Sequence, residues 1–177
     1  MNKTFTAAIA CASIAFAVAP TPANAQGLQC TTFVKDQLAK TRPTTDFSGL
    51  SGNAGQWAKA ATTTAGSKAV TKTPSKGAIM VFAGNGDKAN FASGTKFAAG
   101  EYGHVAVVRG LYAQPEIISV DHANWNSDGK IHLRVPVKTS DGWKTASVWN
   151  VNTNAWGGGK YAVAGFIDPS KFPAKKK

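Results

Sequence analysis

The sequence predicts an α+β domain in which two short N-terminal helices precede an antiparallel sheet. Apolar residues recur at helical spacing just after residue 30, whereas from residue 74 onward the pattern changes to short apolar or alternating runs. Gly, Pro, Asn and Asp separate those later runs. Helices followed by a succession of strands joined by turns are typical of α+β domains with antiparallel pairing.

The first helix is predicted from about Cys30 to Lys40, because Arg42-Pro43 must end it. Its apolar positions are Phe33, Val34, Leu38 and Ala39. A cysteine in the first turn gains from the helix dipole, which favours thiolate over thiol. A second helix is predicted around Ala54–Ala61, inside a Thr-, Ser-, Gly- and Ala-rich stretch, with Trp57 as its core anchor.

The strands follow as a series of short runs. We predict them at residues 78–82, 104–110, 117–125, 130–137, 143–151 and 161–168. A Gly/Asn/Asp-rich loop at 84–88 and a polar connection to Gly100 separate the first two. The run at 130–137 alternates apolar with basic or polar residues, which is typical of a strand with one exposed face.

The length and composition of the chain fit one folded domain. The chain has 177 residues, of which 43% are hydrophobic and 16% are charged. We therefore expect residues 26–177 to form a single domain with a short basic C-terminal tail, acting as a monomer. The terminal Lys175-Lys176-Lys177 is interpreted as a frayed, solvated end.

Residues 1–25 have the organisation of a cleavable secretory signal peptide. Lys3 supplies the positive charge, an apolar stretch follows, and prolines end it before Ala23-Asn24-Ala25, which has the small-x-small pattern of a cleavage site. The apolar run is shorter than the ~20 residues that a bilayer requires. We expect cleavage before Gln26, a secreted or periplasmic location, and no membrane span afterwards.

Loss of the signal would leave one cysteine. Cys11 departs with it, so Cys30 would remain alone in a compartment where disulfides normally form. A lone thiol there is open to oxidation, which suggests that it is used chemically, although intermolecular pairing is the alternative. Neither cysteine fits a lipoprotein site, because the apolar stretch before Cys11 is too short and Gln29 directly precedes Cys30.

The charge is strongly basic. Twenty Lys and Arg residues against 9 Asp and Glu residues give a net charge of +11. Such a surface attracts anionic polymers: nucleic acid, acidic lipids or an anionic cell envelope. Export and the lack of a recognisable reading motif argue against nucleic acid as a partner.

A nucleophilic thiol needs a base, and the base needs an orienting partner. His104 begins a predicted strand directly after Gly103 and is the preferred base. By the two-residue period of a strand, His122 and Asn124 share a face with apolar Ile118 and Val120. We expect that face to be covered by the helix that carries Cys30.

The remaining candidates are placed by the same rule. His122 and Asn124 would then be buried polar groups, and His104 is their natural partner. Asp121 should point outward unless a bulge turns it, and His132, on the alternating strand, should be a surface residue.

A zinc site is the rival chemistry for these residues. Cys30, His104 and His122 could together bind zinc, but no paired spacing such as HxH or CxxC occurs. No EF-hand loop, P-loop or dinucleotide fingerprint occurs either. We expect neither a metal nor a cofactor.

Five segments in order resemble the CHAP domain, the cysteine/histidine-dependent amidohydrolase/peptidase family. They are QCTTFV, GNAGQWA, PSKGAIMVF, GHVAVV and ISVDHANW, which together span about residues 27–125. The resemblance implies a papain-like fold related to the NlpC-type peptidases, with the N-terminal helices packed on the antiparallel sheet. Residues 126–177 match less clearly.

The resemblance implies that Cys30 is the nucleophile and His104 the general base. Many CHAP members have a Glu-x-Asn element before the Trp, and here that register holds His122-Ala123-Asn124, so histidine stands in the Glu position. NlpC-type enzymes use a histidine as third residue, which favours His122, while Asn124 could take the role of the papain-like asparagine. The oxyanion hole would use the Cys30 N–H, which has no intrahelical partner, with Gln29 contributing or packing.

The implied reaction is acyl transfer from an amide to water. Exported CHAP enzymes typically cleave peptidoglycan, either between muramic acid and L-Ala or within the stem and cross-link peptides. Two alternatives remain: an inactivated binding or scaffold module of the envelope, supported by the histidine in the Glu position, and a Cys-dependent amidase acting on another amide.

Overall fold

A computed structural model describes residues 28–84, 99–114, 116–150, 153–157 and 160–176. The α+β prediction is confirmed, because the described chain combines few helices with a large antiparallel sheet. The predicted signal peptide lies outside the described residues, as does nearly all of the predicted loop at 84–88 and most of the connection that follows it.

Both predicted helices are present. Helix α1 spans Cys30–Thr41 and buries one apolar face, and Arg42 N–H closes its last turn on the Leu38 carbonyl at 2.8 Å. A 3₁₀ turn, η1 (Ala54–Gln56), leads directly into α2 (Trp57–Ala65), which ends at Gly66 with φ +85°. Trp57 is fully buried, so its prediction as core anchor is confirmed.

Each predicted strand is also present. The strands are β1 (Val70–Thr71), β2 (Ile79–Phe82), β3 (His104–Leu111), β4 (Ile117–Ala123), β5 (Ile131–Lys138), β6 (Thr145–Asn150), β7 (Ala155–Trp156) and β8 (Tyr161–Ile167). The two-residue strands β1 and β7 were not predicted. The described residues also form the 3₁₀ turns η2 (Ser67–Ala69), η4 (Trp125–Ser127) and η5 (Pro169–Lys171).

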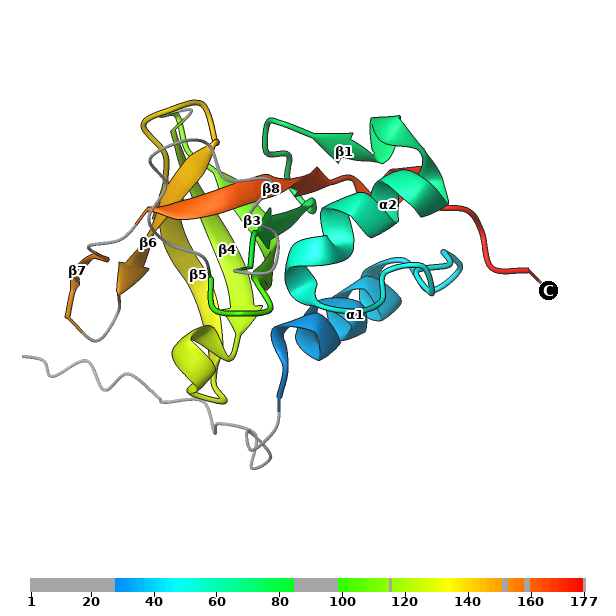
Figure 1. Cartoon of the computed structure of the whole chain (residues 1–177), viewed down its shortest axis with the longest axis horizontal. Coiled ribbons are helices and arrows are strands. Elements are labelled where there is room, and N and C mark those ends of the chain that lie inside the picture. Colours follow the sequence, from blue (N-terminus) through cyan, green and yellow to red (C-terminus); the bar gives the residue numbers. More distant parts are fainter. Residues whose placement is uncertain (1–27, 85–98, 115, 151–152, 158–159, 177) are drawn as a thin grey trace, which may run out of the picture.

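The sheet closes on itself. Its order is β1-β8-β2-β3-β4-β5-β6-β7, all pairings are antiparallel, and β6 also pairs with β8. Closure through this last pairing makes a barrel from β8, β2, β3, β4, β5 and β6. The helices α1 and α2 lie together beside it, near β3 and β8 (Figure 1).

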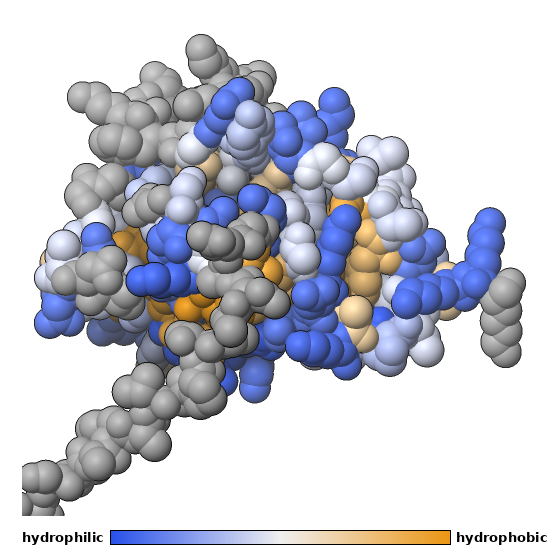
Figure 2. Space-filling model, turned by 90° about the horizontal axis from the view of Figure 1, so that it is seen from below, coloured by the Kyte–Doolittle hydropathy of each residue, from blue (hydrophilic) through white to orange (hydrophobic). Residues whose placement is uncertain are grey.

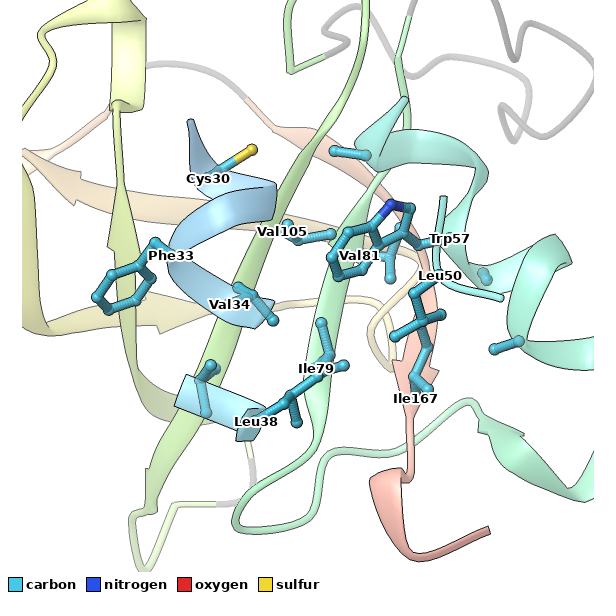
Figure 3. Packing of buried hydrophobic residues seen from close by; sticks show 14 of the residues in the cluster. Cys30, Phe33, Val34, Leu38, Leu50, Trp57, Ile79, Val81, Val105 and Ile167 are labelled. Atoms are coloured by element: carbon cyan, nitrogen blue, oxygen red, sulfur yellow. The ribbon is translucent and has the colours of Figure 1, made fainter. Parts of the chain in front are cut away.

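Two cores lie on opposite sides of the barrel wall. On β2, Met80 and Phe82 point into the barrel, whereas Ile79 and Val81 point outward to α1 and α2. The outer cluster brings Trp57 against Val81 (Figure 3). Burying each such side chain stabilises the fold by roughly 1.5–3 kcal/mol. Strands β2 and β3 are therefore fixed from both faces.

The C-terminal segment is tied to the domain. Lys175 N–H donates to the Thr44 carbonyl at 2.8 Å, and Thr45 pairs with Ala174 in an isolated bridge. The prediction of a frayed end is therefore wrong for the residues up to Lys175, because their backbone is hydrogen-bonded to the domain.

Hydrophilic side chains cover much of the face in Figure 2, with hydrophobic residues visible between them. No helix in the described ranges is long and apolar enough to cross a membrane.

Candidate active site

Cys30 is the first residue of α1, following the N-cap residue Gln29. The cysteine is 9% exposed, and its sulfur lies near Val105 of β3 (Figure 3). Burial raises the pKa of the thiol, while backbone N–H groups of Val105, Thr31 and Cys30 itself act in the opposite direction. Burial is the larger effect, so the resting group at neutral pH is the thiol.

His104 is positioned by a close backbone contact between two glycines. Gly103 has φ +75°, and a Cβ there would lie 2.5 Å from the backbone nitrogen of Gly55 in η1. Gly55 N–H also donates to the Tyr102 carbonyl at 2.9 Å. The start of β3 is thereby held against the turn that begins the second helical segment.

His104 and His122 are hydrogen-bonded, as expected from the facing of β4. Nε2 of His104 lies 3.2 Å from Nδ1 of His122, and the two residues are 5% and 2% exposed. Burial lowers the pKa of His104 well below its ordinary value, helped by the nearby His122 and His132. Burial also lowers the pKa of His122, to about 3. Both imidazoles are therefore neutral at neutral pH.

Because both rings are neutral, each carries one proton, and the hydrogen bond between them restricts which nitrogen holds it. If His104 is to accept the thiol proton at Nδ1, its own proton sits on Nε2 and is donated to Nδ1 of His122. The His122 proton then sits on its Nε2. That atom is buried and has no hydrogen-bond partner among the described residues.

The face of β4 that carries His122 is not covered by the helix that carries Cys30, in contrast to the prediction from the sequence. Ile118 and Val120 belong to the core inside the barrel, whereas Ala123 packs in the cluster with α1. The face that carries Ile118, Val120 and His122 is therefore covered by the barrel interior and not by the helix, because the sheet closes into a barrel and α1 packs on its outer side.

Asn124 lies beside the groove but is engaged elsewhere. It adopts the left-handed conformation with φ 59°, and its Oδ1 accepts the Gly129 N–H at 2.8 Å. Its Nδ2 lies 3.5 Å from Gln29 Oε1. This geometry gives His122, rather than Asn124, the contact with His104.

Asp121 is buried, so the prediction that it points outward is wrong. It faces α1, where Arg109 Nε donates to its Oδ2 at 2.6 Å and Arg109 Nη2 donates to Gln37 Oε1 at 2.6 Å. Arg134 N–H donates to its other oxygen at 2.8 Å. With both faces of β4 covered, Asp121 forms an ion pair with Arg109 of the neighbouring strand β3, and Arg109 links this pair to Gln37 of α1.

His132 is half-buried, so its prediction as a surface residue is also wrong. Its ring stacks on His122 with centroids 5.1 Å apart and planes at 19°, and its Nε2 lies 2.6 Å from Asp128 Oδ2. The cause is a bulge: Val120 pairs with Val135 and His122 with His132, so β5 has one extra residue between them. Arg134 in the bulge has φ 55°.

Cys30 and His104 line one groove of about 580 Å³. Trp125 and Tyr161 also line it, and the Trp125 ring meets His104 edge-on at 4.7 Å between centroids. Gln29, Asn124 and Glu101 contribute polar groups. The arrangement can place a carbonyl carbon near a thiol at a helix N-terminus.

The described residues hold no group of three His, Cys, Asp or Glu side chains arranged to bind a metal ion. His104 and His122 use one nitrogen each on the other, so neither is free to act as a ligand at that atom. The chemistry supported by this geometry is that of a thiol and a neutral imidazole.

The chain matches a protein-family model and is similar to a solved structure. The sequence model of the CHAP domain matches residues 20–124. Among solved structures, the chain is similar to the 2.15 Å crystal structure of N-acetylmuramoyl-L-alanine amidase from Staphylococcus aureus, with 21% identity and a TM-score of 0.42. The match covers 77% of this chain and 30% of that one. No curated protein matches the chain.

Proposed function

The chain belongs to the CHAP domain family of amidohydrolases and peptidases, and on this premise we propose that it is an exported, cysteine-dependent peptidoglycan hydrolase. The activity would be that of an N-acetylmuramoyl-L-alanine amidase or an endopeptidase. We further propose a papain-like arrangement, in which α1 and α2 cover the barrel wall beside the groove.

One observation carries the proposal. The same groove is lined by Cys30, at a helix N-terminus, and by His104, at the start of a strand. His104 is also hydrogen-bonded to His122. A thiol is activated for attack on an amide when a base lies beside it and a further residue orients that base. His122 would fill the third position, which is the role considered for Asn124 and Asp121 as well.

In the first step, the Cys30 sulfur attacks the amide carbonyl while the thiol proton passes to Nδ1 of His104. The thiol has a raised pKa and His104 a lowered one, so proton transfer accompanies attack instead of preceding it. The Cys30 N–H, which has no intrahelical partner, would stabilise the oxyanion.

In the second step, the C–N bond breaks and His104 gives its proton to the leaving amine, which leaves a thioester on Cys30. Water then attacks the thioester carbonyl, with His104 accepting a proton from that water. The C–S bond breaks, the carboxylic acid leaves, and the thiol is restored. His122 holds the imidazolium of His104 through Nδ1 in both steps.

The substrate would be a peptidoglycan amide. The net charge of +11 suits an anionic envelope polymer, and the signal-like residues 1–25 suit export. No nucleic acid, metal or cofactor enters the proposed reaction, and a monomer would suffice for it.

The test is the mass of the fragments released from purified sacculi by the mature protein. Loss of stem peptides from glycan strands would identify an amidase, and shorter or un-cross-linked peptides would identify an endopeptidase. Sacculi that release no fragments, while the protein remains folded, would contradict the proposal. An inactivated binding module would instead sediment with sacculi, and an amidase for another amide would leave them intact without sedimenting.

A further inference from the structure

We propose that His132 and Asp128 are positioning residues that hold the His122 ring with Nδ1 facing His104. This inference rests on the proposed function, since it concerns the same cysteine and histidine.

Among the described residues, one polar contact orients the His122 ring. Nδ1 is bonded to Nε2 of His104, while Nε2 of His122 is buried without a partner in the described part of the chain. A buried polar nitrogen normally has a hydrogen-bond partner. Here the packing of the ring must supply the orientation.

The packing comes from aromatic rings. Trp125 meets the His122 ring at 77° with centroids 5.3 Å apart, so it contacts the ring edge-on. His132 is nearly parallel to the ring at 19° and covers its flat face. A ring covered on its face cannot tilt without displacing the neighbour. His132 therefore restricts the rotation that would turn Nδ1 away.

Asp128 in turn fixes His132. Its Oδ2 lies 2.6 Å from His132 Nε2, a short charge-assisted contact, while its Oδ1 accepts the Lys130 N–H at 3.0 Å. The carboxylate is thus held by the turn that follows η4. Its position sets that of the His132 ring.

The backbone of β5 also supports a positioning role for His132. Without the bulge on β5, strict pairing would place Leu133 opposite His122, whereas the bulge places His132 there. The bulge holds Arg134, a residue with a Cβ, at φ 55°. Such a conformation is unfavourable and persists only where surrounding structure holds it.

The test compares His132→Ala with His132→Phe, which keeps a flat ring but loses the bond to Asp128. Leu133→Ala, an exposed neighbour on the same strand, is the matched control. We measure the rate of Cys30 alkylation by iodoacetamide at pH 7, and kcat and KM on soluble muropeptides. His132→Ala should slow alkylation and lower kcat by roughly tenfold to a hundredfold, with KM unchanged. His132→Phe should recover most of the loss, and Leu133→Ala should match the wild type.

Asp128→Asn keeps the local shape and should slow alkylation in the same direction by a smaller factor. It carries the test if His132→Ala fails to fold. The proposal is overturned if folded His132→Ala or Asp128→Asn is alkylated at the wild-type rate, or if His132→Phe is as impaired as His132→Ala. Alkylation needs no peptidoglycan. If the folded wild type leaves sacculi intact while His132→Ala slows alkylation, the proposed function is overturned and the positioning role stands.

Discussion

His104 and His122 meet at the mouth of the barrel, with Nε2 of one 3.2 Å from Nδ1 of the other and ring planes at 84°. The group that accepts the hydrogen bond from the base His104 is therefore an imidazole. A carboxylate in this position would stabilise the imidazolium form of His104 more strongly. A neutral acceptor stabilises an imidazolium less than an opposite charge does. Burial is the main cause of the low pKa of His104, and the nearby His122 and His132 lower it further.

Substitutions of His122 and Asn124 should show which of the two residues orients the base His104. His122→Ala removes the acceptor of the His104 proton, so kcat/KM should fall by roughly a hundredfold or more. Asn124→Ala removes bonds to Gly129 and Gln29 only, so the loss should stay within a few-fold. Both are measured on the same muropeptide. Equal indifference to the two changes would show that neither supports His104.

The buried histidines should make the protein sensitive to acid. A histidine whose pKa is lower in the folded state binds fewer protons there than in the unfolded chain, so stability is lost as pH falls below 6.5. With a folded pKa of about 3, His122 alone should lower the free energy of unfolding by about 2 kcal/mol between pH 7 and pH 5. His104 acts with the same sign.

Urea unfolding at pH 7, 6 and 5 measures this loss. His122→Gln, which does not titrate, is the control and should show a smaller decrease over the same range. A wild-type free energy that stays flat from pH 7 to pH 5 would mean that the two rings are not held neutral inside the fold.

Asp121 should matter for stability and not for the reaction. Its carboxylate is buried and paired with Arg109, so Arg109→Ala leaves a buried charge with fewer partners and should destabilise by about 1–3 kcal/mol. Asp121→Asn should destabilise less, because it also removes the charge. For both variants, kcat/KM at a temperature where they are folded should stay near the wild-type value. A hundredfold loss in folded Asp121→Asn would make Asp121 part of the catalytic arrangement.

Gly103→Ala should disturb the position of His104. The added Cβ would lie 2.5 Å from Gly55 N in a backbone with φ +75°, so both a clash and strain follow. Gly77→Ala is the matched control, because Gly77 has φ +85° but nothing within 4 Å of its Cβ position. Thermal unfolding should show a modest loss for Gly77→Ala and a clearly larger one for Gly103→Ala. Similar melting temperatures would mean that the glycine contact is unimportant.

Much of the fold could be predicted because its elements carry strong local patterns. Helix α1 has an apolar face and a proline stop, and β2 and β3 are apolar runs bounded by glycine. The strands β1 and β7 have two residues each and no period to detect. Barrel closure through β6 and β8 depends on pairing between distant segments, which no local pattern encodes.

The candidate site was predictable where strand alternation is regular. The facing of His122 followed from Ile118 and Val120, and its bond with His104 followed from burial. His132 was missed because the bulge on β5 shifts the alternation, so that Val135 points inward and Leu133 outward while His132 turns in. The signal available in the sequence was the pair of Asp128 and His132 at a spacing of four.

The central claim is that Cys30 attacks the amide with His104 as its base. The most direct measurement is the rate at which purified sacculi are solubilised by equal amounts of folded wild type, Cys30→Ala and His104→Ala. The account predicts solubilisation by the wild type and none above background by either variant. Solubilisation by Cys30→Ala at the wild-type rate would contradict it.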